Sequence, residues 1–153
     1  MTQRLNPYAV SQKALAPMMA MEAYIADCGL EYSLIQLVKT RASQINGCAN
    51  CLHMHTADAR KAGETEARLY LLNAWRESDL YTPRERAALA WTESLTLITQ
   101  THAPDEDYDA ARGEFSEKEL VDLTLLITAI NAWNRISIGF RMQHPNDKVR
   151  AAA

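Results

Sequence analysis

Two cysteines and two histidines lie close together near the middle of the chain and could carry redox chemistry. They occur in the stretch GCANCLHMH as Cys48, Cys51, His53 and His55. A thiolate is both a nucleophile and a metal ligand, and an imidazole can take up a proton or bind a metal. Two thiols at this spacing can also close a small disulfide once one of them has been oxidised. The segment is therefore the first candidate for a functional site.

A helix through this segment separates the two histidines. At roughly 100° per residue, Cys48, Cys51 and His55 share one face, whereas His53 points to the other side. His55 can then accept a proton from Cys51 or stabilise its thiolate as an imidazolium. Both cysteines lie in the first turn of the expected helix, where the helix dipole lowers the pKa of a thiol. We expect His53 at the surface or at an interface.

Three interpretations of the cysteine pair remain open at this point. A redox-active dithiol is favoured, because a CxxC pair with a histidine on the same face is the minimum equipment of a thiol peroxidase or a disulfide oxidoreductase. Zinc binding by Cys48, Cys51 and His55 would leave a structural site one ligand short. A purely structural role is the third interpretation. The remaining cysteine, Cys28, lies on an apolar helix face and is expected in the core.

Length and composition predict one globular domain spanning residues 1–153. Hydrophobic residues make up 48% of the chain and charged residues 23%, and the net charge is −3 without a basic cluster, so we expect no nucleic-acid partner. The N-terminus lacks a secretory signal. The most apolar stretch, residues 120–140, contains charged and amide side chains, which argue against a membrane span. We therefore expect a cytoplasmic protein, where a CxxC pair is more often catalytic or metal-binding than structural.

Apolar spacing and helix-end signals predict an all-α fold. The polar stretch at residues 100–109 is expected to be a loop. The helices are expected near residues 18–28, 33–46, 48–61, 65–75, 83–98 and 116–140. Capping boxes are expected at three helix starts: Ser33 with Gln36, Thr82 with Glu85, and Ser116 with Glu119.

The sequence resembles the AhpD-like alkylhydroperoxidase family, within the carboxymuconolactone decarboxylase superfamily. The resemblance rests on LVKTRASQINGCANCLHMHTADARKAGE, ERAALAWTESLT and INAWNR, and it covers nearly the whole chain. It implies an all-α fold with the CxxC motif at a helix N-terminus, and peroxidase activity. By this resemblance Cys51 attacks a hydroperoxide, Cys48 resolves the sulfenic acid to a disulfide, and His55 helps to activate the nucleophile. A dithiol donor, such as a lipoylated protein, then reduces the pair, and no cofactor or metal is expected.

One position departs from the family pattern. Relatives carry a glutamate of the proton relay where this sequence has Gln36. A glutamine can hold a water molecule by hydrogen bonds, but it cannot accept a proton, so we expect weak peroxidase turnover. Its side chain either belongs to the site or caps its helix. Glu93 could supply a carboxylate from another helix, but it is expected to be a solvated helix residue.

Two other functions stay open. A carboxymuconolactone-decarboxylase-type enzyme belongs to the same superfamily, although that branch does not require both cysteines. A non-enzymatic thiol-sensing or zinc-binding module would use the same side chains without turnover. Whatever the activity, residues 120–140 are apolar on more than one face, which exceeds what one core side needs. Together with the resemblance, this predicts a homo-oligomer, a trimer or a hexamer built from dimers.

Overall fold

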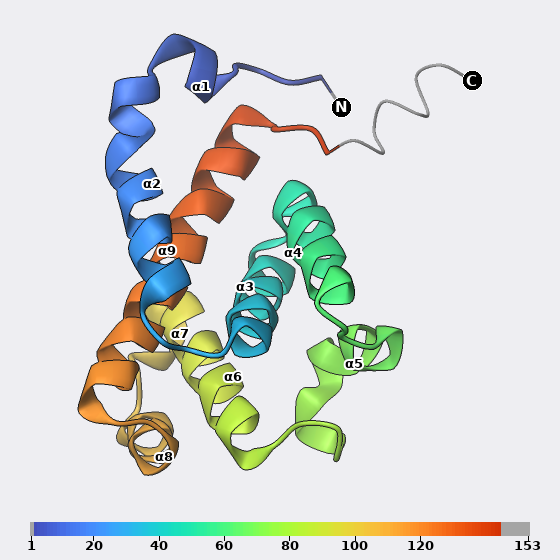
Figure 1. The fold of residues 1–153 in the computed structure, drawn as a ribbon, viewed down its shortest axis with the longest axis vertical. Coiled ribbons are helices and arrows are strands. Elements are labelled where there is room, and N and C mark those ends of the chain that lie inside the picture. The colour runs from blue at the N-terminus through green and yellow to red at the C-terminus, as the bar shows by residue number, and fades with distance from the viewer. Residues whose placement is uncertain (1, 145–153) are drawn as a thin grey trace.

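The computed structural model describes residues 2–144 of the chain, and these residues form helices and no strand (Figure 1). The predicted all-α fold is confirmed. None of the described helices is both long and apolar enough to cross a membrane. The helices are α1 (Pro7–Val10), α2 (Gln12–Asp27), α3 (Tyr32–Asn46), α4 (Ala49–Lys61), α5 (Glu66–Leu71), α6 (Pro83–Thr96), α7 (Ile98–Thr101), α8 (Asp105–Glu114) and α9 (Glu117–Phe140), with a 3-10 helix at Leu72–Glu77.

Helix α3 lies at the centre of the molecule, with α4, α6 and α9 packed around it (Figure 1). Val38 of α3 and both Leu123 and Leu126 of α9 are fully buried in one core cluster, which Ile25 of α2 joins. Burial of an apolar side chain of this size contributes about 1.5–3 kcal/mol. The core therefore fixes α3 and α9 as the frame against which α4 is held.

Two of the three predicted capping boxes are confirmed. Thr82 and Glu85 bond reciprocally at the start of α6, and Ser116 and Glu119 do so at the start of α9. In each case the hydroxyl accepts from a backbone N–H and the carboxylate accepts from the capping residue. These capping boxes fix the start of two of the helices that pack against α3.

The predicted cap at Ser33 is wrong. Helix α3 already begins at Tyr32, and Glu31 before it has the extended backbone of a capping residue. Gln36 therefore lies inside the helix, where its side chain is buried, and it does not complete a capping box. A role in helix capping is thereby removed as an explanation of this glutamine.

The polar stretch at residues 100–109 is a loop only in part. Helix α8 begins at Asp105, directly after Pro104, and carries three acidic residues in its first turn. Carboxylates at this position favour a helix because they face the positive end of its dipole. The helix predicted at residues 65–75 is divided into α5 and the 3-10 helix that follows it.

Candidate active site

The turn between α3 and α4 sets the cysteines at the start of α4. Gly47 has φ of +70°, a backbone conformation that favours glycine, and it ends α3. Cys48 follows as the N-cap of α4. The side chain of Asn46 donates to Asn131 at 2.9 Å and to Asn134 at 2.8 Å, both on α9. The asparagines of the INAWNR stretch thus hold this turn in place.

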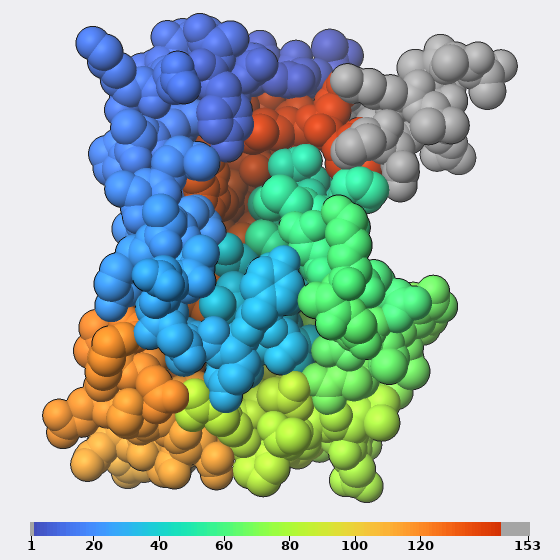
Figure 2. All heavy atoms as spheres, in the orientation of Figure 1, coloured from blue at the N-terminus to red at the C-terminus, as the bar shows by residue number. Residues whose placement is uncertain are grey.

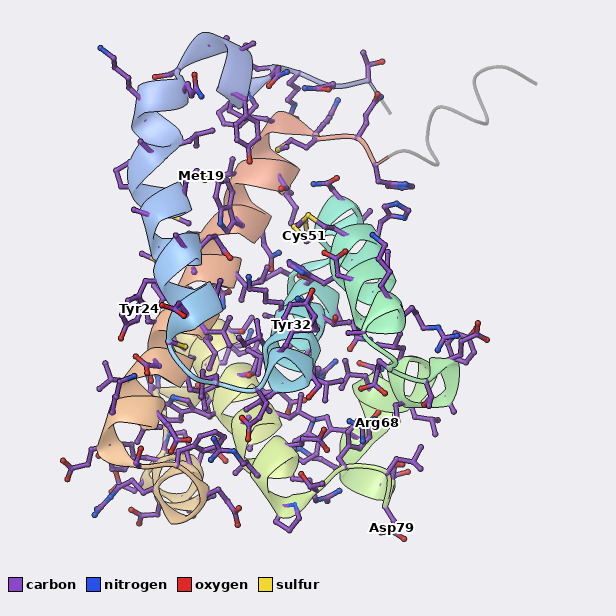
Figure 3. All side chains as sticks on the ribbon, in the orientation of Figure 1. Met19, Tyr24, Tyr32, Cys51, Arg68 and Asp79 are labelled. Carbon is purple, nitrogen blue, oxygen red and sulfur yellow. A yellow bond between two sulfur atoms is a disulfide. The ribbon has the colours of Figure 1, made fainter. Side chains whose placement is uncertain are left out.

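Cys48 and Cys51 form a disulfide, with their Cα atoms 5.4 Å apart. The Cys48 sulfur also accepts a hydrogen bond from the Cys51 backbone N–H at 3.4 Å, as a capping side chain does. Figure 3 shows the disulfide at the N-terminal end of α4, beside α9. Each residue is only 1% exposed. A reactant must therefore reach the sulfurs through an adjoining cavity.

A cavity of about 370 Å³ adjoins Cys51 and is bordered by α1, α2, α3, α4 and α9. Figure 2 shows a hollow between the N-terminal helices, in blue, and α4, in green, with α9 at its floor. Its apolar wall consists of Tyr8, Met19, Met54, Trp133 and Met142. Its polar side consists of Glu22, Gln36, Lys39, His55 and Asp58. Cys48 borders a second cavity of about 310 Å³, between the start of α4 and the end of α9.

His55 and Gln36 meet on the polar side of this cavity. The Nδ1 atom of His55 lies 3.1 Å from the Oε1 atom of Gln36, and both residues are buried. An amide oxygen only accepts hydrogen bonds, so in this pair Nδ1 carries the hydrogen and Nε2 keeps a free lone pair. The structure thus brings together Cys51, His55 and Gln36, which come from two helices.

Burial lowers the pKa of His55 from 6.5 to about 4, and the positive charge of Lys39 acts in the same direction. Asp58 opposes these effects without cancelling them. The imidazole is therefore neutral at pH 7. With Cys48 and Cys51 joined in the disulfide, the buried ring beside a lysine does not hold the extra proton, so no imidazolium is present in this state. A neutral ring with Nε2 unprotonated can still act as a base.

Two other candidate residues lie outside the cavity, and Cys28, which was expected in the core, is only half-buried at its edge. His53 does not border the cavity, and its ring stacks on that of His144 at 5.2 Å between centroids. Cys28 is a free, half-buried cysteine at the end of α2 that packs against the main core. Neither residue is part of the site.

Glu93 is not the solvated helix residue that the sequence predicts. Its carboxylate accepts hydrogen bonds from Arg41, Trp75 and Arg76, at 2.8, 2.8 and 2.9 Å. Burial alone would raise the pKa of Glu93, but the bonds from Trp75 and Arg76 and the charge of Arg41 bring the pKa below its ordinary value. The residue does not border the cavity, so it does not replace the family glutamate.

Sequence reasoning missed Lys39 and Glu22. Lys39 is 6% exposed, and its Nζ atom bonds to Oε2 of Glu22 at 2.5 Å. A signal for Lys39 was present, because it follows Gln36 by one helical turn within an apolar stretch, and lysine is rarely buried without a partner. The sequence gives no sign of its pairing with Glu22, which lies on a different helix.

The zinc alternative finds no support in the structure. The disulfide uses both thiolates that a zinc site would need. Within residues 2–144, moreover, no three histidine, cysteine or acidic side chains form a group that could hold a metal ion. The arrangement fits thiol chemistry better than metal binding.

Comparison with known proteins agrees with this fold. Residues 11–94 match the carboxymuconolactone decarboxylase family. The uncharacterised protein YdfG of Bacillus subtilis strain 168 is 48% identical over 138 residues, which cover 90% of this chain and 94% of YdfG. A crystal structure of a protein of unknown function from Agrobacterium tumefaciens has a TM-score of 0.92 at 46% identity, covering 94% of this chain and 99% of that one. Its assignment as an AhpD antioxidant defence protein is provisional.

A more distant structure shares the fold. An uncharacterised peroxidase-related protein from Ralstonia eutropha JMP134, with an alkylhydroperoxidase AhpD core, has a TM-score of 0.79 at 19% identity. The match covers 92% of this chain and 75% of that one. The helical fold with its cysteine pair defines an AhpD-like protein. The chain belongs to the carboxymuconolactone decarboxylase family.

Proposed function

We propose that the protein is a thiol-dependent peroxidase that reduces hydroperoxides through Cys48 and Cys51 and is regenerated by a dithiol. The observation that carries this proposal is the cysteine pair at the start of α4, with Cys51 open to the cavity that holds His55 and Gln36. Membership of the family and the AhpD-like fold support a peroxidase-like activity. The hydroperoxide is the substrate class that this thiol chemistry fits.

Oxidation begins at Cys51, because this sulfur borders the cavity that contains a base. The thiol gives its proton to Nε2 of His55, and the thiolate attacks the outer oxygen of the hydroperoxide. An S–O bond forms, the O–O bond breaks, and the alcohol leaves with the proton from His55. Cys48 then attacks the sulfur of the sulfenic acid, which closes the disulfide and releases water.

Reduction requires an external dithiol, for which a lipoyl group on a carrier protein is the chemical class proposed. One of its thiolates attacks the disulfide and forms a mixed disulfide. Its second thiol then displaces the protein thiol, which leaves an oxidised donor and both cysteines reduced. Since Gln36 cannot take up a proton, we expect turnover to be weaker than in relatives with a glutamate at this position.

The proposal extends to the setting of the reaction. We place the protein in the cytoplasm, where dithiol donors keep cysteines reduced.

We also propose that it forms a homo-oligomer, a trimer or a hexamer. Val121 and Ile138 of α9 are 68% and 45% exposed, which supports an apolar contact between subunits. Light scattering at micromolar protein concentration tests this, and a monomer would contradict it.

The function is tested by following thiols and turnover in the same preparation. Reduced protein is treated with an organic hydroperoxide, and free thiols are counted by alkylation and mass spectrometry. We expect Cys48 and Cys51 to be lost together while Cys28 stays free, and steady consumption of hydroperoxide when dihydrolipoamide is supplied. Three free thiols after oxidation, with Cys48 and Cys51 still alkylated, would contradict the redox role. Oxidation without turnover would instead indicate a thiol sensor.

A further inference from the structure

The cavity beside Cys51 holds an ion pair that the proposed reaction has not used. Lys39 of α3 and Glu22 of α2 meet there, and their side chains are 8% and 25% exposed. Removing two charges from water is unfavourable, and apolar side chains in place of a buried ion pair often make a protein equally stable or more stable. Stability alone therefore gives little reason for a lysine at this position.

The titratable groups that face the cavity come from four helices. Lys39 is the cation among the described residues that border it, because the buried ring of His55 is neutral at pH 7. Helix α9 contributes only uncharged side chains to this wall. The titratable groups are Tyr8 of α1, Glu22 of α2, Lys39 of α3, and Cys51, His55 and Asp58 of α4. A thiolate formed at Cys51 would therefore share this cavity with the ammonium group of Lys39.

The position of Lys39 in α3 links it to the base of the site. It lies one helical turn after Gln36, on the same face of the helix, and Gln36 holds the ring of His55. The charge of Lys39 also acts on His55, whose pKa it helps to lower. One face of α3 therefore supplies both the group that orients the base and a positive charge for the same cavity.

We propose that Lys39 is a positioning residue whose ammonium group stabilises the Cys51 thiolate, and that Glu22 limits how much of this charge the thiolate receives. This inference rests on the proposed function of Cys51 as the attacking thiol. As the S–H bond breaks, the proton passes to Nε2 of His55, and the ammonium group of Lys39 adds to the imidazolium in balancing the charge left on sulfur. The sulfur then gives its electron pair to the hydroperoxide, which is the oxidant, and the proton leaves with the alcohol.

The test measures how fast iodoacetamide alkylates Cys51 across a range of pH, in reduced protein that carries Cys48→Ser. The tryptic peptide of residues 42–60 contains Cys51 and excludes Cys28, so mass spectrometry follows one thiol. Lys39→Met should move the midpoint of the profile up by about one pH unit, which means about tenfold less thiolate below the midpoint. Glu22→Gln should move the midpoint down, because the freed charge then acts on the thiolate.

Two further variants separate charge from packing. Lys39→Arg keeps the positive charge and should give a profile close to that of the parent protein. Lys118→Met removes a lysine that pairs with Asp122 at 2.7 Å and does not border the cavity, so it should leave the profile unchanged. A purely structural role for the ion pair predicts similar losses of stability in Lys39→Met and Glu22→Gln, without opposite shifts of the profile.

Shifts of the two main variants in the same direction, or no shift in either, would overturn the inference. If Lys39→Met does not fold, the alkylation profile of Glu22→Gln decides the question. An unchanged midpoint in that variant contradicts the proposed role of Lys39. Alkylation needs neither a hydroperoxide nor a dithiol donor. Opposite shifts in a protein that fails to turn over hydroperoxide would therefore refute the proposed function and leave the role of Lys39 standing.

Discussion

Helix α3 carries two ion pairs that face different parts of the molecule. Lys39 pairs with Glu22 beside the cavity of Cys51, whereas Arg41 pairs with Glu93 away from that cavity. Arg41 also donates to the side chains of Gln44 and Asn73, at 3.1 and 2.7 Å. Two basic residues in one helix thus have different surroundings, one with a cavity and the other with a set of polar partners.

The difference is the basis for proposing a structural role for the pair of Arg41 and Glu93 and a chemical role for the pair of Lys39 and Glu22. The carboxylate of Glu93 joins α3, the 3-10 helix and α6, with each of its oxygens hydrogen-bonded. Such a network holds helices in register. The pair of Lys39 and Glu22 faces a cavity that is also bordered by Cys51 and His55. Charged groups in a cleft, where they shift the pKa values of their neighbours, are typical of functional sites.

Serine substitutions of the two cysteines should have the largest effect on activity. Cys51→Ser and Cys48→Ser should each reduce hydroperoxide turnover to background, because a serine hydroxyl is not ionised at neutral pH and cannot form the disulfide. Only Cys48→Ser should accumulate a sulfenic acid, which dimedone labelling followed by mass spectrometry locates on Cys51. Sulfenic acid on Cys48 in the Cys51→Ser variant would reverse the assignment of attacking and resolving thiols.

Glu93→Ala should lower the stability of the protein by removing the partner of Arg41. This change leaves Arg41 without its carboxylate, and its side chain is only 12% exposed. Loss of one partner of a buried ion pair costs about 3 kcal/mol, or roughly a hundredfold in the unfolding equilibrium. Urea unfolding measures this loss, while the alkylation profile of Cys51 should stay as in the parent protein.

A matched control for Glu93→Ala is Glu66→Ala. Glu66 pairs with Arg60 at 3.7 Å, and its side chain is 62% exposed. Exposed ion pairs contribute at most about 1 kcal/mol, so this variant should unfold close to the parent protein. Equal losses in the two variants would remove the distinction between a buried network and an ordinary surface pair.

Acid should lower the stability of the folded protein, because His55 is buried in its neutral form. Its pKa is 6.5 when unfolded and about 4 when folded, so above pH 6.5 both states are neutral and nothing is lost. As the pH falls from 6.5 to 4, the unfolded chain binds a proton that the folded chain does not, and stability falls. At about 1.4 kcal/mol for each pKa unit, the loss below pH 4 approaches about 3 kcal/mol.

Urea unfolding of His55→Gln at several pH values isolates this contribution from that of the other acidic and basic groups. The variant lacks the titrating ring, so the difference in unfolding free energy between it and the parent protein should change steadily between pH 6.5 and pH 4. Both proteins must be compared in the same redox state. A difference that stays constant over this range would mean that the folded protein protonates His55 as readily as the unfolded chain.

Much of the fold was predictable from the sequence, because local signals agreed with tertiary packing. The expected helix from residue 48 to residue 61 placed the cysteines at a helix start, and helical spacing placed His55 on their side. The prediction at Ser33 was wrong because Ser33 and Gln36 have the spacing of a capping box although the helix already begins at Tyr32. The N-cap position is taken by Glu31. Short-range patterns can thus be correct in type and wrong in position.

The electrostatics of the site were not predictable, because they depend on contacts between helices. The low pKa of His55 requires its burial and the approach of Lys39, and neither is visible in spacing along one helix. Glu22 and Lys39 likewise meet only after α2 has packed near α3. Glu93 was misjudged for the same reason, since its partners come from two other segments.

The smallest effect concerns Gln36, the residue at the position where the family resemblance led us to expect a glutamate. Because Gln36 is inside α3 and bonded to His55, Gln36→Glu would place a carboxylate on the Nδ1 side of the ring. A carboxylate there raises the pKa of His55 and makes Nε2 a better base. Lys39, one turn further along α3, would favour the ionised form of the new glutamate, which burial alone would disfavour.

General-base assistance contributes about 10²–10⁴-fold where it is fully in place, and an unadapted site should gain less. We therefore expect Gln36→Glu to raise the rate of hydroperoxide turnover with dihydrolipoamide about tenfold. Gln36→Leu is the matched control, because it keeps the size of the side chain but removes the acceptor for Nδ1–H, and it should lower the rate. Direct titration of His55 by NMR should show a raised pKa in Gln36→Glu. If that pKa rises while the rate does not, proton transfer by His55 does not limit turnover, and the glutamine is no handicap to this protein.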